Sequence, residues 1–368
     1  MPTLRRLYEE LGQSPWLDNL SRSGLQDGTM LRLVASGVRG VTANPTIVAR
    51  ALESSNVYDQ QIHQLITAGH SVEDVYWDLA ITDVTAALEL LRPTFDTSDG
   101  GDGFVSIEVA PDCANDTVAT ERAARDLHDR IHEPNLLVKI PATSQGVSAI
   151  EAMTAEGRSI NVTLIFSLTR YTEVLEAYLS GLETLAGNRG DLSSVHSVAS
   201  FFVSRVDTEV DRRLEDGGTD QAGTLRGRAA VAQAKLAYRL FRRAHSGERW
   251  QRLAAKGARV QRPLWASTST KNPRYPDTLY VDQLIGPDTV NTLPEDTIRA
   301  FQDHGALART IDVDVADAER VMRAIAAAGV DMDDVGRTLE NEGIAGFLKS
   351  FTHVLGMLAA KRHTLPEG

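Results

Sequence analysis

Short apolar or β-branched runs alternate with longer helical patterns along most of the chain, as far as about residue 305. Runs of about four to eight such residues predict strands, and apolar positions three and four apart predict amphipathic helices. Eight strands are expected, near residues 16–19, 39–42, 104–109, 136–140, 160–165, 198–203, 263–266 and 289–292. The helices expected between them include residues 72–91, 116–131, 144–156, 168–185, 221–243 and 294–302.

Strand–helix alternation repeated eight times favours an α/β fold of the (β/α)8 type, a TIM barrel, over an open doubly wound sheet. The open sheet usually has a glycine-rich phosphate turn, and neither GxGxxG nor GxxxxGKT occurs here. After about residue 310 the pattern changes to alanine-rich helices, over residues 315–328, 332–341 and 345–362. We expect a single domain, a barrel over residues 1–310 with a C-terminal helical extension packed on it over residues 311–368; a separate small domain is the alternative. Residues 96–103 and 216–223 are expected to be surface loops.

Charge and composition narrow the class of protein. The 368 residues include 38 Lys plus Arg and 50 Asp plus Glu, a formal charge of −12, which argues against nucleic acid or an anionic membrane as a partner. Cys113 is the only cysteine, so an intrachain disulfide and a cysteine-based zinc site are excluded, as suits a reducing cytoplasm. The start MPTLRRLYEELGQ is unlike a signal peptide, and apolar runs such as VASFFV are too short to cross a membrane. We expect a soluble cytoplasmic protein.

Lysine is scarce in this chain. Six of the 38 basic residues are lysines, leaving 38 − 6 = 32 arginines, so a lysine in an apolar strand needs its own explanation. Lys139 has such a position in NLLVKIPATSQG. Desolvation inside a barrel favours the neutral amine, which can attack a carbonyl carbon and form a Schiff base. The other interpretation is a structural lysine that pairs with a carboxylate or extends its amine to solvent at the strand end.

The expected strands before and after the Lys139 strand end in paired polar positions. Glu108 and Ser106 share one face of the first, and Asn161 and Thr163 share one face of the second. Polar side chains that face inward cost free energy unless they are hydrogen-bonded, so these positions suggest a polar pocket. Glu108 either moves protons through a water molecule or only neutralises Lys139.

The first expected strand brings Asp18 and the second brings Asn44, and each has the alternative of capping the next turn or helix. Polar residues thus recur at the carboxyl ends of several strands, which is where barrel enzymes place their sites. A metal site is not expected, because the nine histidines include no HExxH or other close pair, and the nucleophile elbow GxSxG is also missing.

An acidic protein that binds a phosphorylated metabolite needs a local cluster of cations. The segment ASFFVSRVD places Ser200 and Phe202 on one strand face and Arg205 just beyond it, and WASTSTKNP offers Ser267 and Lys271. Their position on loops at the expected active end favours them as phosphate ligands. The alternative for each cation is an ordinary solvated surface charge.

Six stretches carry these residues in a fixed order: GVTANPTI, SIEVAPDCANDT, LLVKIPATSQG, INVTLIFSLTRY, SFFVSRVD and RPLWASTSTKNPRYPDTLYVDQLIGPDTVNTLPEDT. Together they resemble the transaldolase family, specifically its longer bacterial type, over nearly the whole chain. The resemblance implies a class I aldolase barrel without metal or organic cofactor. It also implies a cytoplasmic transferase of the pentose phosphate pathway that acts on phosphorylated sugars.

Carried over position by position, the resemblance makes Lys139 the Schiff-base lysine that holds a dihydroxyacetone unit. Asp18 would remove the C4 hydroxyl proton as the C3–C4 bond breaks, and Glu108 would work through a water molecule held by Thr163. The substrate contacts would be Asn44, Asn161 and Ser200 to hydroxyls, with Phe202 beside them, and Arg205, Ser267 and Lys271 to the phosphate. A protonated imine at C2 stabilises the carbanion left by the departing aldose. Sedoheptulose 7-phosphate and glyceraldehyde 3-phosphate would thus exchange with erythrose 4-phosphate and fructose 6-phosphate.

The chain departs from some relatives at informative positions. Shorter relatives place an arginine soon after the serine of the seventh-strand motif, whereas this chain reads ASTSTKN, with Lys271 two residues later. Small fructose 6-phosphate aldolases carry Gln and Tyr where this chain has Glu108 and Phe202, which favours transfer over simple cleavage. A fructose 6-phosphate-type aldolase and a non-catalytic sugar-phosphate binding barrel are the alternatives, and a monomer and a homodimer are both open.

Overall fold

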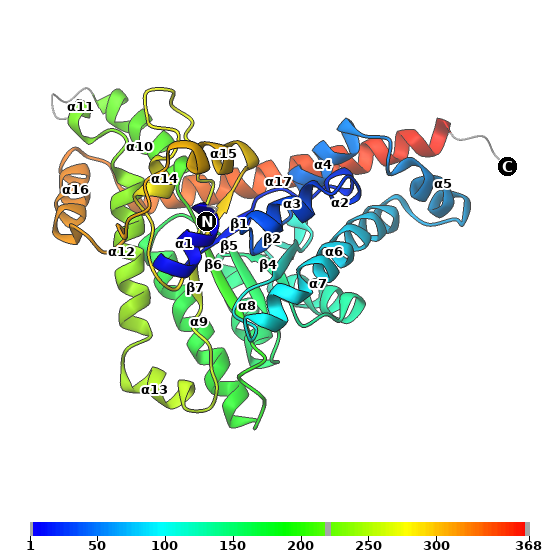
Figure 1. The fold of residues 1–368 in the computed structure, drawn as a ribbon, viewed down its shortest axis with the longest axis horizontal. Coiled ribbons are helices and arrows are strands. Elements are labelled where there is room, and N and C mark those ends of the chain that lie inside the picture. The colour runs from blue at the N-terminus through cyan, green and yellow to red at the C-terminus, as the bar shows by residue number, and fades with distance from the viewer. Residues whose placement is uncertain (1–2, 218–221, 365–368) are drawn as a thin grey trace.

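Eight parallel strands form a closed barrel in chain order, with β8 pairing with β1 (Figure 1). The computed structural model describes residues 3–217 and 222–364. The strands are β1 (Gln13–Leu17), β2 (Gly40–Thr42), β3 (Phe104–Glu108), β4 (Leu136–Pro141), β5 (Ile160–Ile165), β6 (Ser197–Phe202), β7 (Arg262–Ala266) and β8 (Thr289–Leu293). Each predicted strand is present close to its expected bounds, so the prediction of a TIM barrel is confirmed.

The first strand begins three residues earlier than its apolar pattern predicts. Gln13 and Ser14 are polar but fully buried. Gln13 Nε2 donates to the carbonyl of Leu284 at 2.6 Å, and Ser14 Oγ donates to Asp102 Oδ2 at 2.5 Å. Polar groups are stable inside a protein once they are hydrogen-bonded. Because both partners are distant in sequence, the local pattern gives no sign of them.

The surface loop expected over residues 96–103 is confirmed only in part, because residues 98–103 form a turn and loop that is partly buried. Helix α6 (Val72–Thr97) includes the first two positions, and Asp102 is fully buried at the amino end of the barrel. Its carboxylate accepts hydrogen bonds from Ser14 Oγ, Trp16 Nε1 at 2.9 Å, Arg39 Nε at 2.9 Å and Arg262 Nη2 at 3.3 Å. These donors offset the cost of desolvating the carboxylate, so an acidic residue is stable there.

Helices surround the barrel, and several begin at a side-chain cap that the sequence provides. Asp116, Thr143 and Ser167 cap α7 (Thr117–Ile131), α8 (Ser144–Ala155) and α9 (Leu168–Gly187). The other elements up to the end of β8 and just beyond are α1 (Thr3–Leu11), α2 (Arg22–Gln26), α3 (Thr29–Ser36), α4 (Pro45–Ser54), α5 (Asp59–Thr67), η1 (Pro111–Cys113), α10 (Ser204–Gly217), α11 (Ala222–Leu225), α12 (Ala229–Ala244), α13 (Glu248–Ala254), α14 (Leu279–Asp282) and α15 (Glu295–His304).

The helix expected over residues 221–243 is interrupted. Helices α11 and α12 are separated by a turn in which Gly227 has a φ of +69°. A Cβ atom on Gly227 would lie 2.7 Å from Cζ of Tyr275, so glycine meets both a backbone and a space requirement here. Of the surface loop expected over residues 216–223, the first two residues end α10 and the last two begin α11, while residues 218–221 lie outside the described residues.

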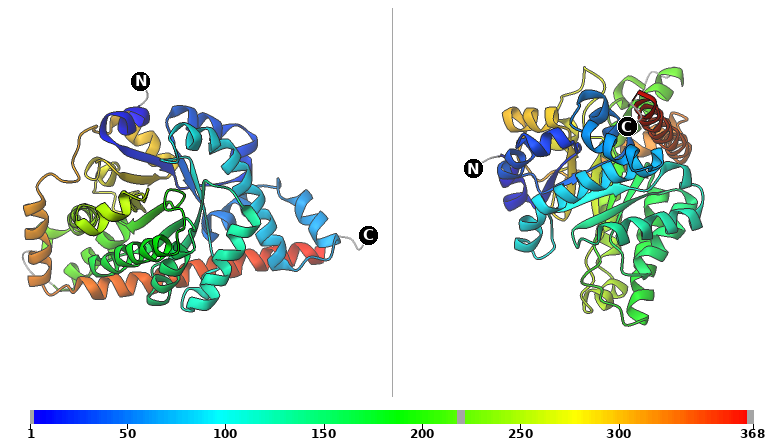
Figure 2. Two further views of the ribbon diagram at one scale, coloured as in Figure 1. Left: turned by 90° about the horizontal axis from the view of Figure 1, so that it is seen from below. Right: turned by 90° about the vertical axis from the view of Figure 1, so that its right-hand side faces the viewer.

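The chain ends in α16 (Val315–Ala327) and α17 (Met332–Thr364). Two helices were expected over residues 332–341 and 345–362, but α17 is continuous and runs along one side of the molecule (Figure 2). Gly343 lies in the expected gap. A Cβ atom there would come within 2.9 Å of Leu164 Cδ2, so this glycine permits close packing on the barrel and does not end the helix.

The second half of α17 forms a small core with α4, α5 and α6. Phe351, Val354 and Leu358 are buried there together with Leu52 and Tyr76. By length and composition alone, α17 is also the one helix among the described residues that could cross a membrane. A packed helix of a soluble protein passes the same test, and its buried face against α4 and α6 accounts for part of its apolar character.

Candidate active site

A cavity of about 350 Å³ opens at the carboxyl ends of the strands. Of the eleven predicted site residues, nine line it: Asp18, Asn44, Lys139, Thr163, Ser200, Phe202, Arg205, Ser267 and Lys271. Glu108 and Asn161 are not among the described residues that line it, although each contacts one that does. The barrel thus brings together side chains that are up to 253 residues apart, since 271 − 18 = 253.

Lys139 and Glu108 form a buried pair in the throat of the barrel. Strands β3 and β4 pair in a register that sets the two residues directly opposite each other. Lys139 Nζ lies 3.2 Å from Glu108 Oε2 and donates to the carbonyl of Ala43 at 3.4 Å. The two residues are 5% and 4% exposed. Burial raises the pKa of Glu108, and the charge of Lys139 opposes that rise.

Asp18 and Asn44 reach the cavity from the ends of β1 and β2. Asp18 Oδ1 accepts a hydrogen bond from Thr42 Oγ1 at 3.1 Å, and no helix is capped by this side chain among the described residues. Asn44 is the N-cap of α4, because its Oδ1 accepts from Ile47 N at 3.0 Å. The capping interpretation is therefore confirmed for Asn44, which lines the cavity as well.

Strands β3, β5 and β6 share a buried hydrogen-bond chain below the cavity. Asn161 Nδ2 donates to Ser106 Oγ at 2.9 Å, and Ser200 Oγ donates to Asn161 Oδ1 at 2.7 Å. Asn161 is fully buried. Thr163 lies one layer higher, and its buried Oγ1 has no hydrogen-bond partner among the described residues. An open hydroxyl facing a polar cavity can bind a water molecule or a ligand.

Two strand ends beside the cavity adopt left-handed backbone conformations. Leu164 has a φ of 58°, where the register between β5 and β6 shifts, and Ser267 has a φ of 56°. Such conformations cost about 1–3 kcal/mol for residues other than glycine and concentrate at functional sites. At β7 the result is that Ser267 lines the cavity with its hydroxyl 2.9 Å from that of Ser204.

Three cations converge on the outer part of the cavity. The guanidinium of Arg205 lies 5.2 Å from the ring centre of Phe202, and Lys271 Nζ donates to Ser269 Oγ at 2.7 Å. Arg50, which the sequence did not single out, lines the same cavity. Burial, followed by the charges of Arg205 and Arg50, lowers the pKa of Lys271. Within the described ranges, none of these three cations forms an ion pair with a carboxylate.

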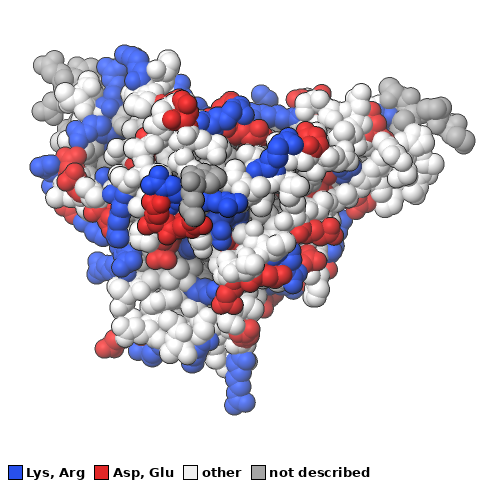
Figure 3. Space-filling model, viewed as in Figure 1, with Lys and Arg blue, Asp and Glu red and all other residues white. Residues whose placement is uncertain are grey.

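Elsewhere most cations are paired. Figure 3 shows basic and acidic side chains interspersed over one face of the molecule. Arg213, for example, contacts Asp334 of α17 at 2.7 Å, and Arg170 contacts Glu340 of the same helix at 3.3 Å. Unpaired cations gathered in one cavity of an acidic protein indicate a site for an anion.

Helices α4 and α17 supply four of the lining residues that the sequence missed, and the others are Thr42, Leu264, Ala266, Ser269, Thr292 and Pro294. Thr46, Ile47 and Arg50 lie on one face of α4, at a spacing that helical periodicity would have revealed once Asn44 was placed as its cap. Phe347 comes from α17, and no local pattern links it to the barrel. Ser350 Oγ of α17 lies 2.9 Å from Thr46 Oγ1, which joins the two helices into one wall.

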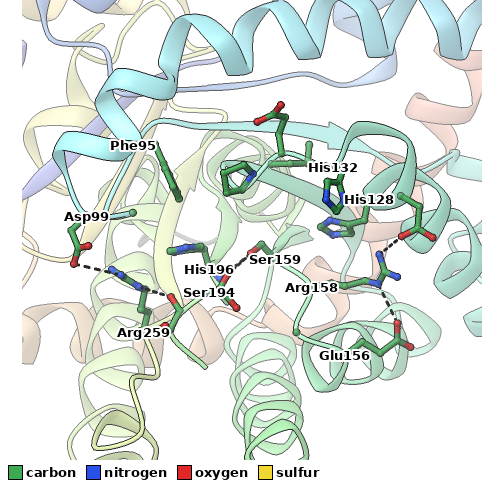
Figure 4. A pocket seen from close by; sticks show the side chains of 17 residues that line it. Phe95, Asp99, His128, His132, Glu156, Arg158, Ser159, Ser194, His196 and Arg259 are labelled. Carbon is green, nitrogen blue, oxygen red and sulfur yellow. Dashed lines mark hydrogen bonds and ion pairs between the residues drawn. The ribbon is translucent and has the colours of Figure 1, made fainter. Parts of the chain in front are cut away.

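A larger cavity, of about 630 Å³, lies at the opposite end of the barrel (Figure 4). Burial lowers the pKa of His128 to about 4 and that of His196 to about 3, so both rings are neutral at physiological pH. Arg158 is already occupied by Asp129 at 2.9 Å and Glu156 at 3.2 Å. This cavity lacks the free cations and the lysine–carboxylate pair of the smaller one, and barrel enzymes place their chemistry at the other end.

Comparison with known proteins identifies the family of the chain. The chain matches, over residues 15–358, the family model described as Transaldolase/Fructose-6-phosphate aldolase. The chain belongs to this family. It is 48% identical to a transaldolase of Thermobifida fusca (strain YX) over 352 residues, which cover 95% of this chain and 96% of that relative. It is 50% identical to a transaldolase of Acidothermus cellulolyticus (strain ATCC 43068 / DSM 8971 / 11B) over 345 residues, 93% of this chain and 92% of that relative.

The family resemblance read from the motifs is therefore confirmed, and the cavity at the carboxyl ends of the strands remains the candidate site. Its candidate lysine, Lys139, occupies the centre of the barrel, with Glu108 beside it on β3 and Asp18 on the cavity wall. The amine of Lys139, the carboxylate of Asp18 and a cationic rim face the cavity, and a second carboxylate, Glu108, contacts that amine.

Proposed function

We propose that this protein is a transaldolase, a transferase that moves a dihydroxyacetone unit from sedoheptulose 7-phosphate to glyceraldehyde 3-phosphate. The products are erythrose 4-phosphate and fructose 6-phosphate. Relatives named transaldolase that are about half identical over nearly the whole chain support this function. We also propose that the protein acts in the cytoplasm, in keeping with its single cysteine.

The position of Lys139 is the observation that carries the proposal. Its amine is buried in the barrel throat and borders the cavity, so a ketose can reach it while bulk water is largely excluded. The neutral amine would attack the C2 carbonyl and form a carbinolamine, which loses water to give an imine. Once protonated, the imine nitrogen draws electron density from C3 and lowers the barrier to breaking the C3–C4 bond.

Two carboxylates would accept and transfer the protons of this reaction. Asp18 lines the cavity and would accept the C4 hydroxyl proton as the aldose leaves. Glu108, next to Lys139, would transfer protons during formation and hydrolysis of the carbinolamine and imine, through a water molecule held by Thr163. The open hydroxyl of Thr163 supports that assignment.

The sugar chain would be held by Asn44 and Ser200, with Phe202 packing beside it. The side-chain oxygen of Asn44 is used in capping α4, which leaves its amide group as a donor to a hydroxyl. The amide of Asn161 is already bonded to Ser106 and Ser200, so Asn161 would orient Ser200 from below.

The phosphate would bind among Arg205, Ser267 and Lys271, as the resemblance implies, and we add Arg50. Like charges that converge in a partly buried space repel one another. A phosphate dianion between them would attract all of the cations and offset this repulsion. The absence of carboxylate partners for the three cations within the described ranges supports this binding mode.

Borohydride reduction in the presence of fructose 6-phosphate tests the proposal. We expect a dihydroxyacetone-derived adduct, found by intact mass and mapped by peptide analysis to Lys139. Lys235→Arg is a matched control, because Lys235 is a second buried lysine whose Nζ donates to the carbonyl of Val313 at 2.9 Å, away from the site. The adduct should persist in that control and disappear in Lys139→Arg. No adduct in the wild-type protein would favour the non-catalytic sugar-phosphate binding barrel.

The family description also includes fructose-6-phosphate aldolase, which is the second candidate. That enzyme would release free dihydroxyacetone, and the lysine adduct would not separate the two activities. Turnover of fructose 6-phosphate with and without erythrose 4-phosphate does separate them. Transfer predicts strong dependence on the acceptor, whereas efficient cleavage without an acceptor would establish the aldolase.

A further inference from the structure

Glu108 borders a small cavity that is separate from the candidate catalytic cavity. This cavity has a volume of about 20 Å³ and lies between β3, the start of α4 and α6. Its polar wall consists of Glu108, Asn44, Tyr58, Tyr76 and Asp83. Asn44 borders both cavities, so the small one lies directly behind the catalytic site. The volume suits about one water molecule, which also needs at least two polar partners.

Most polar groups around this small cavity are already used. Tyr58 Oη donates to Asp83 Oδ2 at 2.8 Å and accepts from Arg22 N at 3.0 Å. Asp83 Oδ1 accepts from Arg22 Nε at 2.6 Å. The oxygen of Asn44 caps α4. These oxygen atoms have their partners and need no water molecule, and the amide nitrogen of Asn44 is the donor proposed above for a sugar hydroxyl.

Tyr76 and Glu108 are the exceptions. Tyr76 is 4% exposed, and its ring is fixed by edge contacts with Phe351 at 4.9 Å and Trp77 at 5.0 Å between ring centres. Its hydroxyl makes no hydrogen bond with any described residue, although the side chain lines the small cavity. Glu108 Oε2 faces Lys139 at 3.2 Å, whereas the other oxygen, Oε1, makes no hydrogen bond with any described residue. A hydroxyl and a carboxylate oxygen without partners among the described residues, from two side chains that line one small cavity, favour a bridging water molecule.

We propose that Tyr76 is a positioning residue for Glu108: its hydroxyl donates to a water molecule in the small cavity, and that water donates to the Glu108 carboxylate. The inference rests on the proposed function, because it concerns the carboxylate that would transfer protons next to the imine. It gives Glu108 a fixed contact on the side opposite Lys139, which holds the carboxylate in place when the amine becomes bonded to substrate.

The bridge has a consequence for pH dependence. The charged groups that face Glu108 are Lys139 from β4, Asp18 from β1 and Arg205 from α10. Those around the small cavity are Asp83 and its partner Arg22. All of them stay when the Tyr76 hydroxyl is removed, so only the donated hydrogen bond is lost. A donor to a carboxylate favours its ionised form, and losing it raises the pKa of Glu108.

The test compares Tyr76→Phe with Tyr58→Phe. Both changes remove one hydroxyl from the same small cavity, but the Tyr58 hydroxyl serves Asp83. For acceptor-dependent turnover of fructose 6-phosphate, we expect Tyr76→Phe to lower kcat several-fold and to move the acid limb of kcat/KM to higher pH by about one unit. Tyr58→Phe should lower Tm and leave the acid limb in place.

An unchanged acid limb in Tyr76→Phe overturns the inference, and so does an equal shift in both variants, which would indicate a general effect of enlarging the cavity. Borohydride trapping separates this result from the proposed function. A wild-type adduct on Lys139 combined with an unmoved limb in Tyr76→Phe removes only the role of Tyr76, whereas a missing adduct removes the proposed function itself.

Discussion

Acid should destabilise this protein in part through His196, whose ring lies at the amino end of the barrel (Figure 4). The residue is 8% exposed, and its ring packs against Phe95 and Phe104, with ring centres 5.6 and 5.0 Å apart. Burial, followed by the charges of Arg259 and Arg262, lowers the pKa of His196 from its ordinary 6.5 to about 3. The folded protein keeps this ring neutral at pH values where the unfolded chain has already protonated it.

The sign and size of the effect follow from these two pKa values. The folded state binds the His196 proton more weakly than the unfolded chain does. The contribution of His196 to the free energy of unfolding is therefore fully present above pH 6.5 and falls as the pH drops towards about 3. Between about pH 7.5 and about pH 5 the free energy of unfolding should fall by about 2 kcal/mol from this residue alone. With about 2.1 cal/mol/K of unfolding entropy per residue, the 368 residues would lose about 3 °C in Tm.

His196→Phe removes the titrating ring and keeps an aromatic side chain in the cluster. Free energies of unfolding from chemical denaturation, measured for both proteins at both pH values, isolate His196. Other titrating groups, such as Asp207, whose pKa burial raises to about 6, cancel in the difference, and so does a constant packing penalty. We expect the variant to lose about 2 kcal/mol less than the wild-type protein on acidification.

The exposed His63 provides the matched control for this experiment. His63→Gln should lose as much stability on acidification as the wild-type protein does, because the replaced side chain is exposed on α5 and the buried His196 ring is unchanged. Equal losses in the wild-type protein and in His196→Phe would refute the reasoning, since the ring would then carry no linkage between protonation and folding.

Three further predictions concern the catalytic end. Lys139→Arg should keep the circular dichroism spectrum and Tm almost unchanged yet abolish turnover, because a guanidinium stays protonated; measurable activity would contradict the Schiff-base role. Arg50→Gln should lower kcat/KM for fructose 6-phosphate about tenfold in steady-state kinetics. The control Arg252→Gln, at an exposed site on α13, should leave kcat/KM unchanged. Similar values of kcat/KM for the two variants would argue against a contact between Arg50 and the phosphate. In thermal unfolding, Gly346→Ala should stabilise the protein by about 0.5–1 kcal/mol, because no atom lies within 4 Å of the added Cβ. Gly343→Ala should destabilise the protein, because its added Cβ would meet Leu164. Higher stability in both variants would contradict the close packing of α17 on the barrel.

Local sequence was a good guide wherever the determining contacts are local. Strand β4 and its neighbours were placed correctly, because runs of Val, Ile and Leu have to be buried on both faces of a parallel barrel. The starts of α8 and α9 were also placed correctly, at residues 144 and 168, and each helix begins after a residue, Thr143 or Ser167, that bonds to the backbone three residues ahead. The prediction of two helices failed for α17, because the helix continues through residues 342–344, where Gly343 packs against Leu164 of the barrel.

The candidate site was predictable in outline for a similar reason. In a barrel, residues at the carboxyl ends of strands converge whatever their separation in sequence, so polar residues at those ends were expected to meet. Asn161 shows the limit of that argument: its strand face was correct, but its depth places it below the cavity, bonded to Ser106 and Ser200. Facing inward and reaching the cavity are different properties, and the second depends on the strand register and tilt.

The sequence by itself determined the order of strands and helices, the family, and the residue types at the strand ends, because strand and helix formation and capping depend on neighbours a few residues away. Only the tertiary structure decided that Glu108 lies opposite Lys139 and that Asp102 is buried. It also decided that Arg50 lines the same cavity as Arg205 and Lys271, and that Phe347 of α17 lines that cavity too. The physical reason is that each of these properties is a contact between segments distant in the chain. Barrel closure and the packing of α17 set those contacts, and no local pattern encodes them.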